Sequence, residues 1–259
     1  MLTYQFSEAG TSHVLAGRGN EDAQAVAAHG DVAFVFVADG MGSAARGGEA
    51  ARAAVEAAAA LVPWTYVPNE ALRAPSLGFA VRAAFPIAYN SLIGAADRGG
   101  WDTRDMLTTF MCAGFDARSG RLEYGFCGDG GIVALTRGGK VRLLTKAARG
   151  ARPGQTTPLH SCGDWLFGSC ENVLAFFVCT DGLFERLCPG GRLPEATSIR
   201  GRRVRKLVKG LLRKPARLGG EQLRIVLDNA LSSARPSEDD LGWLMDDVTD
   251  DRTLVLVSA

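Results

Sequence analysis

The sequence predicts an α+β fold, in which helices pack outside a core of antiparallel sheet. Three observations indicate this class: apolar runs of strand length, two consecutive hairpin patterns in the middle of the chain, and long Ala-rich stretches without breakers. Hairpins join neighbouring antiparallel strands, and their separation from the helical stretches along the chain favours helices outside the sheet.

Three apolar runs predict central strands. They are residues 31–38 (Asp-Val-Ala-Phe-Val-Phe-Val-Ala), Val173–Cys179 and Thr253–Val257. Each is apolar at successive positions rather than alternate ones, which is typical of a strand covered on both faces.

The hairpins are predicted from runs separated by turn residues. Thr108–Phe115 and Leu122–Cys127 are joined by Asp-Ala-Arg-Ser-Gly at 116–120, and Ile132–Thr136 and Val141–Leu144 by Arg-Gly-Gly at 137–139. Because glycine and aspartate favour turns, both pairs are expected to be antiparallel.

Four segments predict helices. Gly48–Val62 is rich in Ala and Glu and has no breaker, whereas Asn69–Asp97 contains Pro75 and Pro86, which should break or kink it. Two further helices are expected at Arg202–Leu212 and Gly220–Ala234, and an irregular loop over 147–168. No repeat or low-complexity linker divides the chain, so residues 1–259 are expected to form a single domain.

Composition excludes several classes of protein. The 259 residues have a formal net charge of +1, which gives no reason to expect a nucleic-acid or membrane partner. There is no apolar stretch of about 18 residues and no signal-peptide pattern at the start, so a cytoplasmic protein is expected. None of the six cysteines forms a CxxC pair, which favours buried reduced thiols over disulfides or zinc.

Acidic residues recur where the apolar runs end. One Asp-Gly pair is an ordinary turn, but several carboxylates that converge from different strands need a cation between them. Hard oxygen ligands suit Mg²⁺ or Mn²⁺ rather than zinc. The segments are Asn20-Glu21-Asp22, Asp39-Gly40-Met41-Gly42, Gly128-Asp129-Gly130, Asp181-Gly182-Leu183 and Asp250-Asp251-Arg252-Thr253.

These segments resemble, in order and over nearly the whole chain, the motifs of the metal-dependent type 2C (PPM) serine/threonine phosphatases, most closely a compact bacterial branch. Ala38-Asp-Gly-Met-Gly42 followed by Gly47-Gly-Glu-Ala50 resembles the family signature. The resemblance implies a four-layer α/β/β/α sandwich, with two antiparallel sheets flanked by helices and a two-metal site at one edge. It also implies hydrolysis of phosphoserine and phosphothreonine by in-line attack of a hydroxide that bridges two Mn²⁺ or Mg²⁺ ions.

The resemblance also implies roles for individual residues. Asp39 would bridge both metals, with the Gly40 carbonyl on one of them. Asp181 and Asp250 would bind the second metal, and Asp246 is a competitor for the place of Asp250 because it begins a similar Asp-Asp-x-Thr pattern. Glu21 and Asp22 would hold metal-bound waters, with Asp22 nearest the site, and Asp129 would help to hold a third, weaker ion.

The phosphate-binding residue is left open by the sequence. Many relatives have an arginine before the Glu-Asp pair, and Arg18 is the candidate here, although its spacing is one residue short; Arg46 and His13 are alternatives. Met41 stands where animal members have a histidine, Gly128-Asp-Gly130 replaces Gly-Asp-Ser, and Glu185 replaces a third-metal aspartate. The expected catalytic residues are Asp22, Asp39 and Arg18.

The predicted partners are a phosphoprotein substrate and a cognate serine/threonine kinase in a bacterial signalling pathway. The alternative is a pseudophosphatase, which would use the same fold as a regulatory binding module. A third possibility is a hydrolase of small phosphate esters. Basic residues 200–206 with Lys209 predict a solvated helix face, or a docking surface for an acidic partner.

Overall fold

A computed structural model of the chain describes residues 1–66, 76–145, 156–159, 165–188, 191–193, 208–210, 212–213 and 250–259. The named helices are α1 (Thr11–Leu15), α2 (Gly47–Thr65), α3 (Leu77–Gly99), α4 (Asp181–Leu187) and the 3-10 helix η2 (Thr103–Asp105). The strands are β1 (Leu2–Glu8), β2 (Asp22–His29), β3 (Val32–Asp39), β4 (Phe110–Asp116), β5 (Arg121–Cys127), β6 (Gly131–Thr136), β7 (Val141–Leu143), β8 (Leu166–Cys170), β9 (Val173–Cys179) and β10 (Arg252–Ser258).

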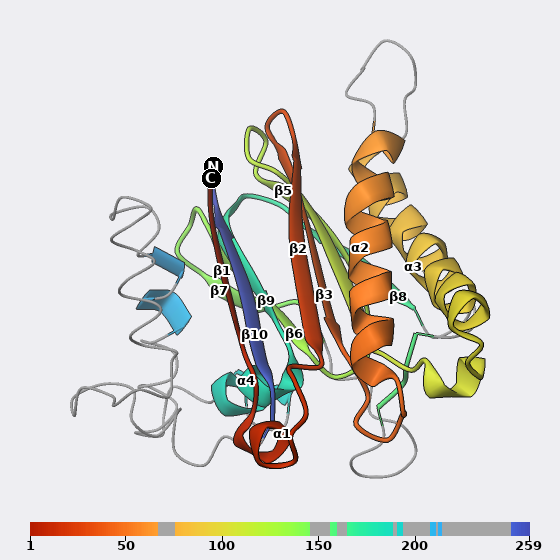
Figure 1. The fold of residues 1–259 in the computed structure, drawn as a ribbon. Helices are drawn as coiled ribbons and strands as arrows, with labels where there is room; N and C mark the ends of the chain where they lie inside the picture. Colours follow the sequence, from red (N-terminus) through yellow and green to blue (C-terminus); the bar gives the residue numbers. More distant parts are fainter. Residues whose placement is uncertain are drawn as a thin grey trace.

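The strands form two five-stranded antiparallel sheets that face each other (Figure 1). We call them sheet A, in the order β1-β10-β9-β6-β7, and sheet B, in the order β2-β3-β4-β5-β8. The two ends of the chain are neighbours in sheet A, where Leu2 pairs with Ser258. The core between the sheets is apolar, and Phe115 of sheet B meets Phe176 of sheet A with ring centroids 5.4 Å apart.

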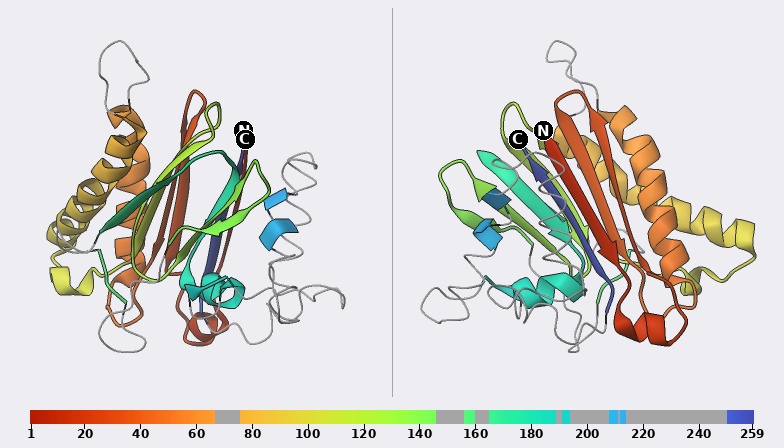
Figure 2. Two further views of the ribbon diagram at one scale, coloured as in Figure 1. Left: turned by 180° about the vertical axis from the view of Figure 1, so that it is seen from behind. Right: turned by 60° about the vertical axis from the view of Figure 1, so that its left-hand side comes forward.

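Helices cover the outer face of each sheet, which completes the predicted four layers (Figures 1 and 2). On sheet B, α2 and α3 cover the face to which Phe34 and Phe36 point, while Val35 and Val37 point towards sheet A. On sheet A, apolar side chains of α4 and of the helical residues 208–210 and 212–213 pack on the outer face.

Both predicted hairpins are confirmed as β4–β5 and β6–β7, and the three central strands as β3, β9 and β10. The helix predicted at Gly48–Val62 is α2, which continues to Thr65. Its buried alanines recur every four residues and form one apolar face against sheet B.

A break at Pro86 is wrong, because α3 continues through this residue to Gly99, while a kink there stays a prediction. Pro86 removes the partner of the Arg82 carbonyl, but both residues are exposed, so water can satisfy that carbonyl. The Ser76 hydroxyl caps the start of α3 by accepting from the Phe79 amide at 3.3 Å, and Gly100, with φ 64°, ends the helix.

Several other predictions concern segments that lie wholly or partly outside the described residues. Pro75, the helix at Gly220–Ala234 and most of the helix at Arg202–Leu212 lie outside them, although 208–210 and 212–213 are helical. The loop expected over 147–168 is wrong at its end, where β8 begins at Leu166. Five of the cysteines are free and buried, as expected, while Cys162 lies outside the described part. Among the described helices, none has the length and apolar character of a membrane span.

Candidate metal centre

The strand ends and segments that carry five predicted aspartates lie at one end of the two sheets, where α1 and α4 also lie (Figures 1 and 2). Asp22 begins β2 and pairs in register with Asp39, which ends β3. Asp181 lies close enough to Asp39 for its charge to raise the pKa of Asp39, and the charges of Asp129 and Asp250 raise the pKa of Asp181. Sheet B thus supplies Asp22 and Asp39, and segments flanking strands of sheet A supply the other three.

The backbone at Asp39 and Gly40 is held from several sides. The Asp39 amide donates to the Thr109 hydroxyl at 3.0 Å, and the Asp39 carbonyl accepts from the Thr108 hydroxyl at 2.8 Å. The Gly40 amide donates to the Glu21 carbonyl at 3.1 Å. A Cβ on Gly40 would lie 2.3 Å from the Gly47 carbonyl carbon, so only glycine fits.

Asp181 and Asp250 belong to segments next to β9 and β10 of sheet A. Asp181 is the first residue of α4, and Asp250 lies two residues before β10, exposed at the edge of the centre. Asp246, the competing candidate, lies outside the described residues. A Cβ on Gly182 would lie 2.1 Å from the Asp251 carbonyl oxygen, so glycine at this position allows α4 to begin against β10.

Burial and mutual repulsion raise the pKa values of these carboxyls. The pKa of Asp22 and of Asp39 lies well above the usual value, mainly because of burial, with a further rise from neighbouring carboxylates. Burial and the charge of Asp129 raise the pKa of Asp181 to about 7. Bound cations would reverse this effect, because a nearby positive charge favours the ionised carboxylates.

Two orphaned oxygens indicate that the site fits a cation. Oδ1 of Asp22 and Oδ1 of Asp181 are buried and have no hydrogen-bond partner within the described part of the chain. In that same part, no three His, Cys, Asp or Glu side chains are placed, as they stand, to hold one metal ion. The donor set nevertheless suits Mg²⁺, which is usually bound through one or two carboxylates and keeps several waters.

Arg18, the predicted phosphate-binding residue, lies at a cleft beside the centre. Its guanidinium pairs with both carboxylate oxygens of Glu21, at 2.6 and 2.7 Å. The cleft has a volume of about 660 Å³ and is lined largely by small residues between Gly42 and Gly48, with Arg52 and Glu49 also present.

The alternatives to Arg18 are engaged elsewhere. Arg46 donates to Glu49 at 3.1 Å and lies 4.7 Å from the centroid of the Trp101 ring. His13, in α1, has Nδ1 2.9 Å from Oδ1 of Asp251. All three side chains therefore lie against carboxylates, and the assignment of the substrate phosphate to Arg18 stays a prediction.

Two residues beside the centre were missed by the sequence reasoning, although both belong to its motifs. The Thr180 hydroxyl donates to Asp22 Oδ2 at 2.8 Å and accepts from the Thr253 amide at 3.0 Å. The Asp251 carboxylate accepts from the backbone amides of Gly10 and Glu21. Their proximity to Asp181 and Asp250 was the only signal. Asp129, the third-ion candidate, is contacted by the hydroxyl of Thr156.

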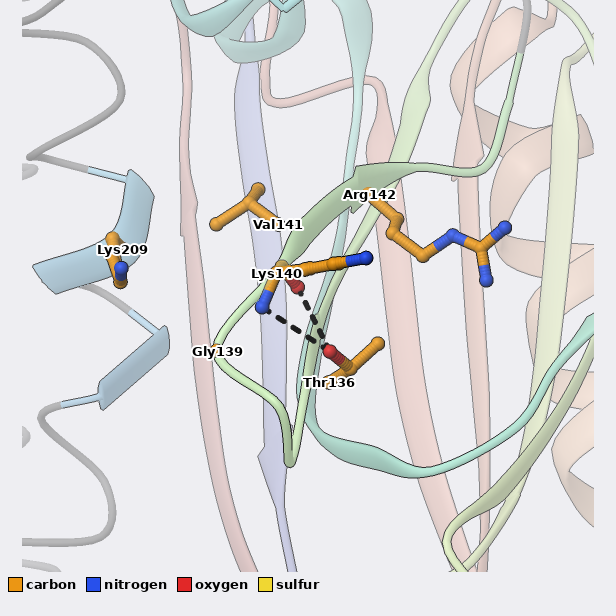
Figure 3. A pocket seen from close by; sticks show the side chains of 6 residues that line it. All are labelled: Thr136, Gly139, Lys140, Val141, Arg142 and Lys209. Atoms are coloured by element: carbon orange, nitrogen blue, oxygen red, sulfur yellow. Dashed lines mark hydrogen bonds between the residues drawn. The ribbon is translucent and has the colours of Figure 1, made fainter.

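A second cavity, of about 620 Å³, lies at the β6–β7 hairpin, where Lys140, Val141 and Lys209 are among its lining residues (Figure 3). Figure 3 shows Val141 directed towards the segment that contains Lys209, while Lys140 extends away from it. The hairpin turn lies at the opposite end of β6 from Gly131, which pairs with Cys179 beside the metal centre. The predicted basic residues 200–206 lie outside the described part.

Solved structures of bacterial phosphatases share this fold. The S. agalactiae serine/threonine phosphatase has a TM-score of 0.63 at 14% identity, over 99% of this chain and 98% of its own. The serine/threonine phosphatase Stp1 from Staphylococcus aureus has a TM-score of 0.59 at 14% identity, over 100% of this chain and 95% of its own. RsbX, solved in complex with magnesium, has a TM-score of 0.56 at 13% identity, over 98% and 92%.

Sequence comparison gives the family. No curated protein sequence matches the chain. Residues 9–213, however, match the model of the protein phosphatase 2C family, which covers well over half of the chain. The chain therefore belongs to the protein phosphatase 2C family of serine/threonine phosphatases, which confirms the family, the fold and the enzyme class that the motifs predicted.

Proposed function

We propose that this chain is a metal-dependent phosphatase that hydrolyses phosphoserine and phosphothreonine in proteins. The observation that carries the proposal is the convergence of Asp22, Asp39, Asp129, Asp181 and Asp250, with two buried carboxylate oxygens unpartnered among the described residues. Buried carboxylates are costly to desolvate and repel one another, so a bound cation would stabilise such a cluster.

The residues would divide the ions between them as the family motifs imply. Asp39 and the Gly40 carbonyl would hold one ion, and Asp39, Asp181 and Asp250 a second. Asp22, which accepts from Thr180, would orient water at the centre, and Asp129 would hold a third, weaker ion. Bound Mg²⁺ or Mn²⁺ would lower the pKa of a water and neutralise charge on the phosphoryl group.

Arg18 would bind the substrate phosphate. A guanidinium matches two phosphate oxygens as well as it matches the two carboxylate oxygens of Glu21 that it holds in the absence of substrate. An Arg18→Ala variant should therefore raise KM for a phosphopeptide more than it lowers kcat. An unchanged KM would exclude this role.

The proposal also covers the cellular location of the enzyme and its partners. The buried free thiols support a cytoplasmic enzyme, and the family supports a phosphoprotein substrate phosphorylated by a cognate kinase. A structure from work on the bacterial stressosome shares the fold, with a TM-score of 0.55, which is consistent with a signalling role. Residues 1–259 are proposed to form one domain.

The decisive experiment is hydrolysis of p-nitrophenyl phosphate with Mn²⁺ and with EDTA, beside an Asp39→Asn variant. Activity that needs the metal and disappears in the variant supports the proposal. A folded, metal-replete protein without activity would favour the pseudophosphatase alternative, and a preference for small esters over phosphopeptides would favour the small-ester hydrolase.

A further inference from the structure

We infer that Asp251 is a positioning residue that holds the two halves of the metal centre in register. This inference rests on the proposed metal site. Sheet B supplies Asp22 and Asp39, whereas Asp181 and Asp250 belong to segments beside strands of sheet A. A contact that crosses from one sheet to the other must therefore fix the distance between the two sets of carboxylates.

The Asp251 carboxylate makes that contact. It is 2% exposed, and its Oδ2 accepts from the backbone amide of Glu21 at 2.6 Å. Its Oδ1 accepts from the backbone amide of Gly10 at 2.7 Å. One side chain next to β10 thus holds the residue before α1 and the residue before β2.

Asp251 and its hydrogen-bond partner Glu21 are each the sequence neighbour of a proposed metal ligand. Asp251 follows Asp250, whose Oδ1 accepts from the Asp251 amide at 2.9 Å. Glu21 precedes Asp22, and its carbonyl accepts from the Gly40 amide at 3.1 Å. A displacement of the Asp251 carboxylate would therefore move groups that belong to both sheets.

The Asp251 carboxylate also lies near other charged groups of the centre. The charge of Asp251 contributes to the raised pKa of Asp22, so in the absence of metal it adds repulsion to a crowded acidic centre. His13 lies against it, with Nδ1 2.9 Å from Asp251 Oδ1 and Nε2 3.9 Å from Glu21 Oε2. The geometry of the centre is fixed by the two hydrogen bonds that the Asp251 carboxylate accepts from backbone amides.

The two amide donors also explain why asparagine is a poor substitute. A carboxylate presents two acceptor oxygens, one for each N–H, whereas an amide side chain presents one oxygen and one NH₂. Asp251→Asn would turn a donor towards either Gly10 or Glu21 and lose one of the two bonds without changing the size of the side chain.

The test measures Mn²⁺ affinity by isothermal titration calorimetry on the full chain, for the original protein, Asp251→Asn and a matched control, Asp116→Asn. Asp116, the last residue of β4, likewise accepts from a backbone amide, that of Arg118, at 2.9 Å, but lies at the far end of sheet B. Loss of an outer contact around metal ligands typically weakens binding about 10–100-fold. We expect that loss in Asp251→Asn and no change in Asp116→Asn.

A second variant, His13→Ala, tests the same carboxylate from α1. It should weaken Mn²⁺ binding less than Asp251→Asn does, because both amide bonds remain, and it serves if Asp251→Asn does not fold. Unchanged Mn²⁺ affinity in a folded Asp251→Asn variant overturns the inference while the proposed function stands. If that variant does not fold, unchanged affinity in His13→Ala has the same consequence. An original protein that binds no Mn²⁺ overturns both.

Discussion

Thr180→Val should remove a contact between the two sheets beside the metal centre and lower the free energy of unfolding. The hydroxyl of Thr180 is fully buried, accepts from the Thr253 amide at 3.0 Å and donates to Asp22 Oδ2 at 2.8 Å. Valine has nearly the same shape but can neither accept nor donate. The substitution therefore removes both bonds without opening a cavity.

The magnitude follows from these two bonds. A buried amide left without an acceptor costs about 1–3 kcal/mol, and a hydrogen bond to a charged group contributes about 1.5–3 kcal/mol. The added methyl returns about 0.8 kcal/mol of apolar burial. The free energy of unfolding should therefore fall by about 2–5 kcal/mol.

Urea unfolding in EDTA measures this change without interference from bound metal. Thr180→Ser is the matched control: it keeps the hydroxyl and loses one buried methyl, so it should lose only about 1 kcal/mol. If Thr180→Val were as stable as Thr180→Ser, the two bonds would not contribute as argued here.

Three further outcomes are expected. Because burial raises the pKa of Asp181 to about 7, the stability that this carboxyl contributes in EDTA should be fully present below its ordinary pKa and lost as pH rises through about 7; an unfolding free energy that rises over this range would contradict the assignment. Added Mg²⁺ should reduce that loss, which thermal unfolding at several pH values would detect. Gly182→Ala should destabilise the fold by about 1–3 kcal/mol, since its Cβ would lie 2.1 Å from the Asp251 carbonyl oxygen; an unchanged Tm would show that α4 can shift freely. Pro86→Ala should stabilise the protein by about 1–2 kcal/mol, because it restores a helical N–H at an exposed position of α3; a lower urea midpoint would argue against this.

The sequence alone determined the elements whose signals are local. The runs that form β3 and β9 are apolar at successive positions because both faces of each strand are buried. The turns at 116–120 and 137–139 contain the glycines that the two hairpins require, with φ of 74° at Gly120 and 77° at Gly139. The order of the acidic motifs was sufficient to predict the family and the five aspartates.

Tertiary structure decided what local pattern could not encode. β2 is rich in alanine, which favours helix, and becomes a strand because it pairs with β3. β1 pairs with β10 across nearly the whole length of the chain. The roles of Thr180 and Asp251 likewise depend on contacts between the sheets, because a hydrogen bond between residues more than 150 positions apart leaves no periodic trace in the sequence.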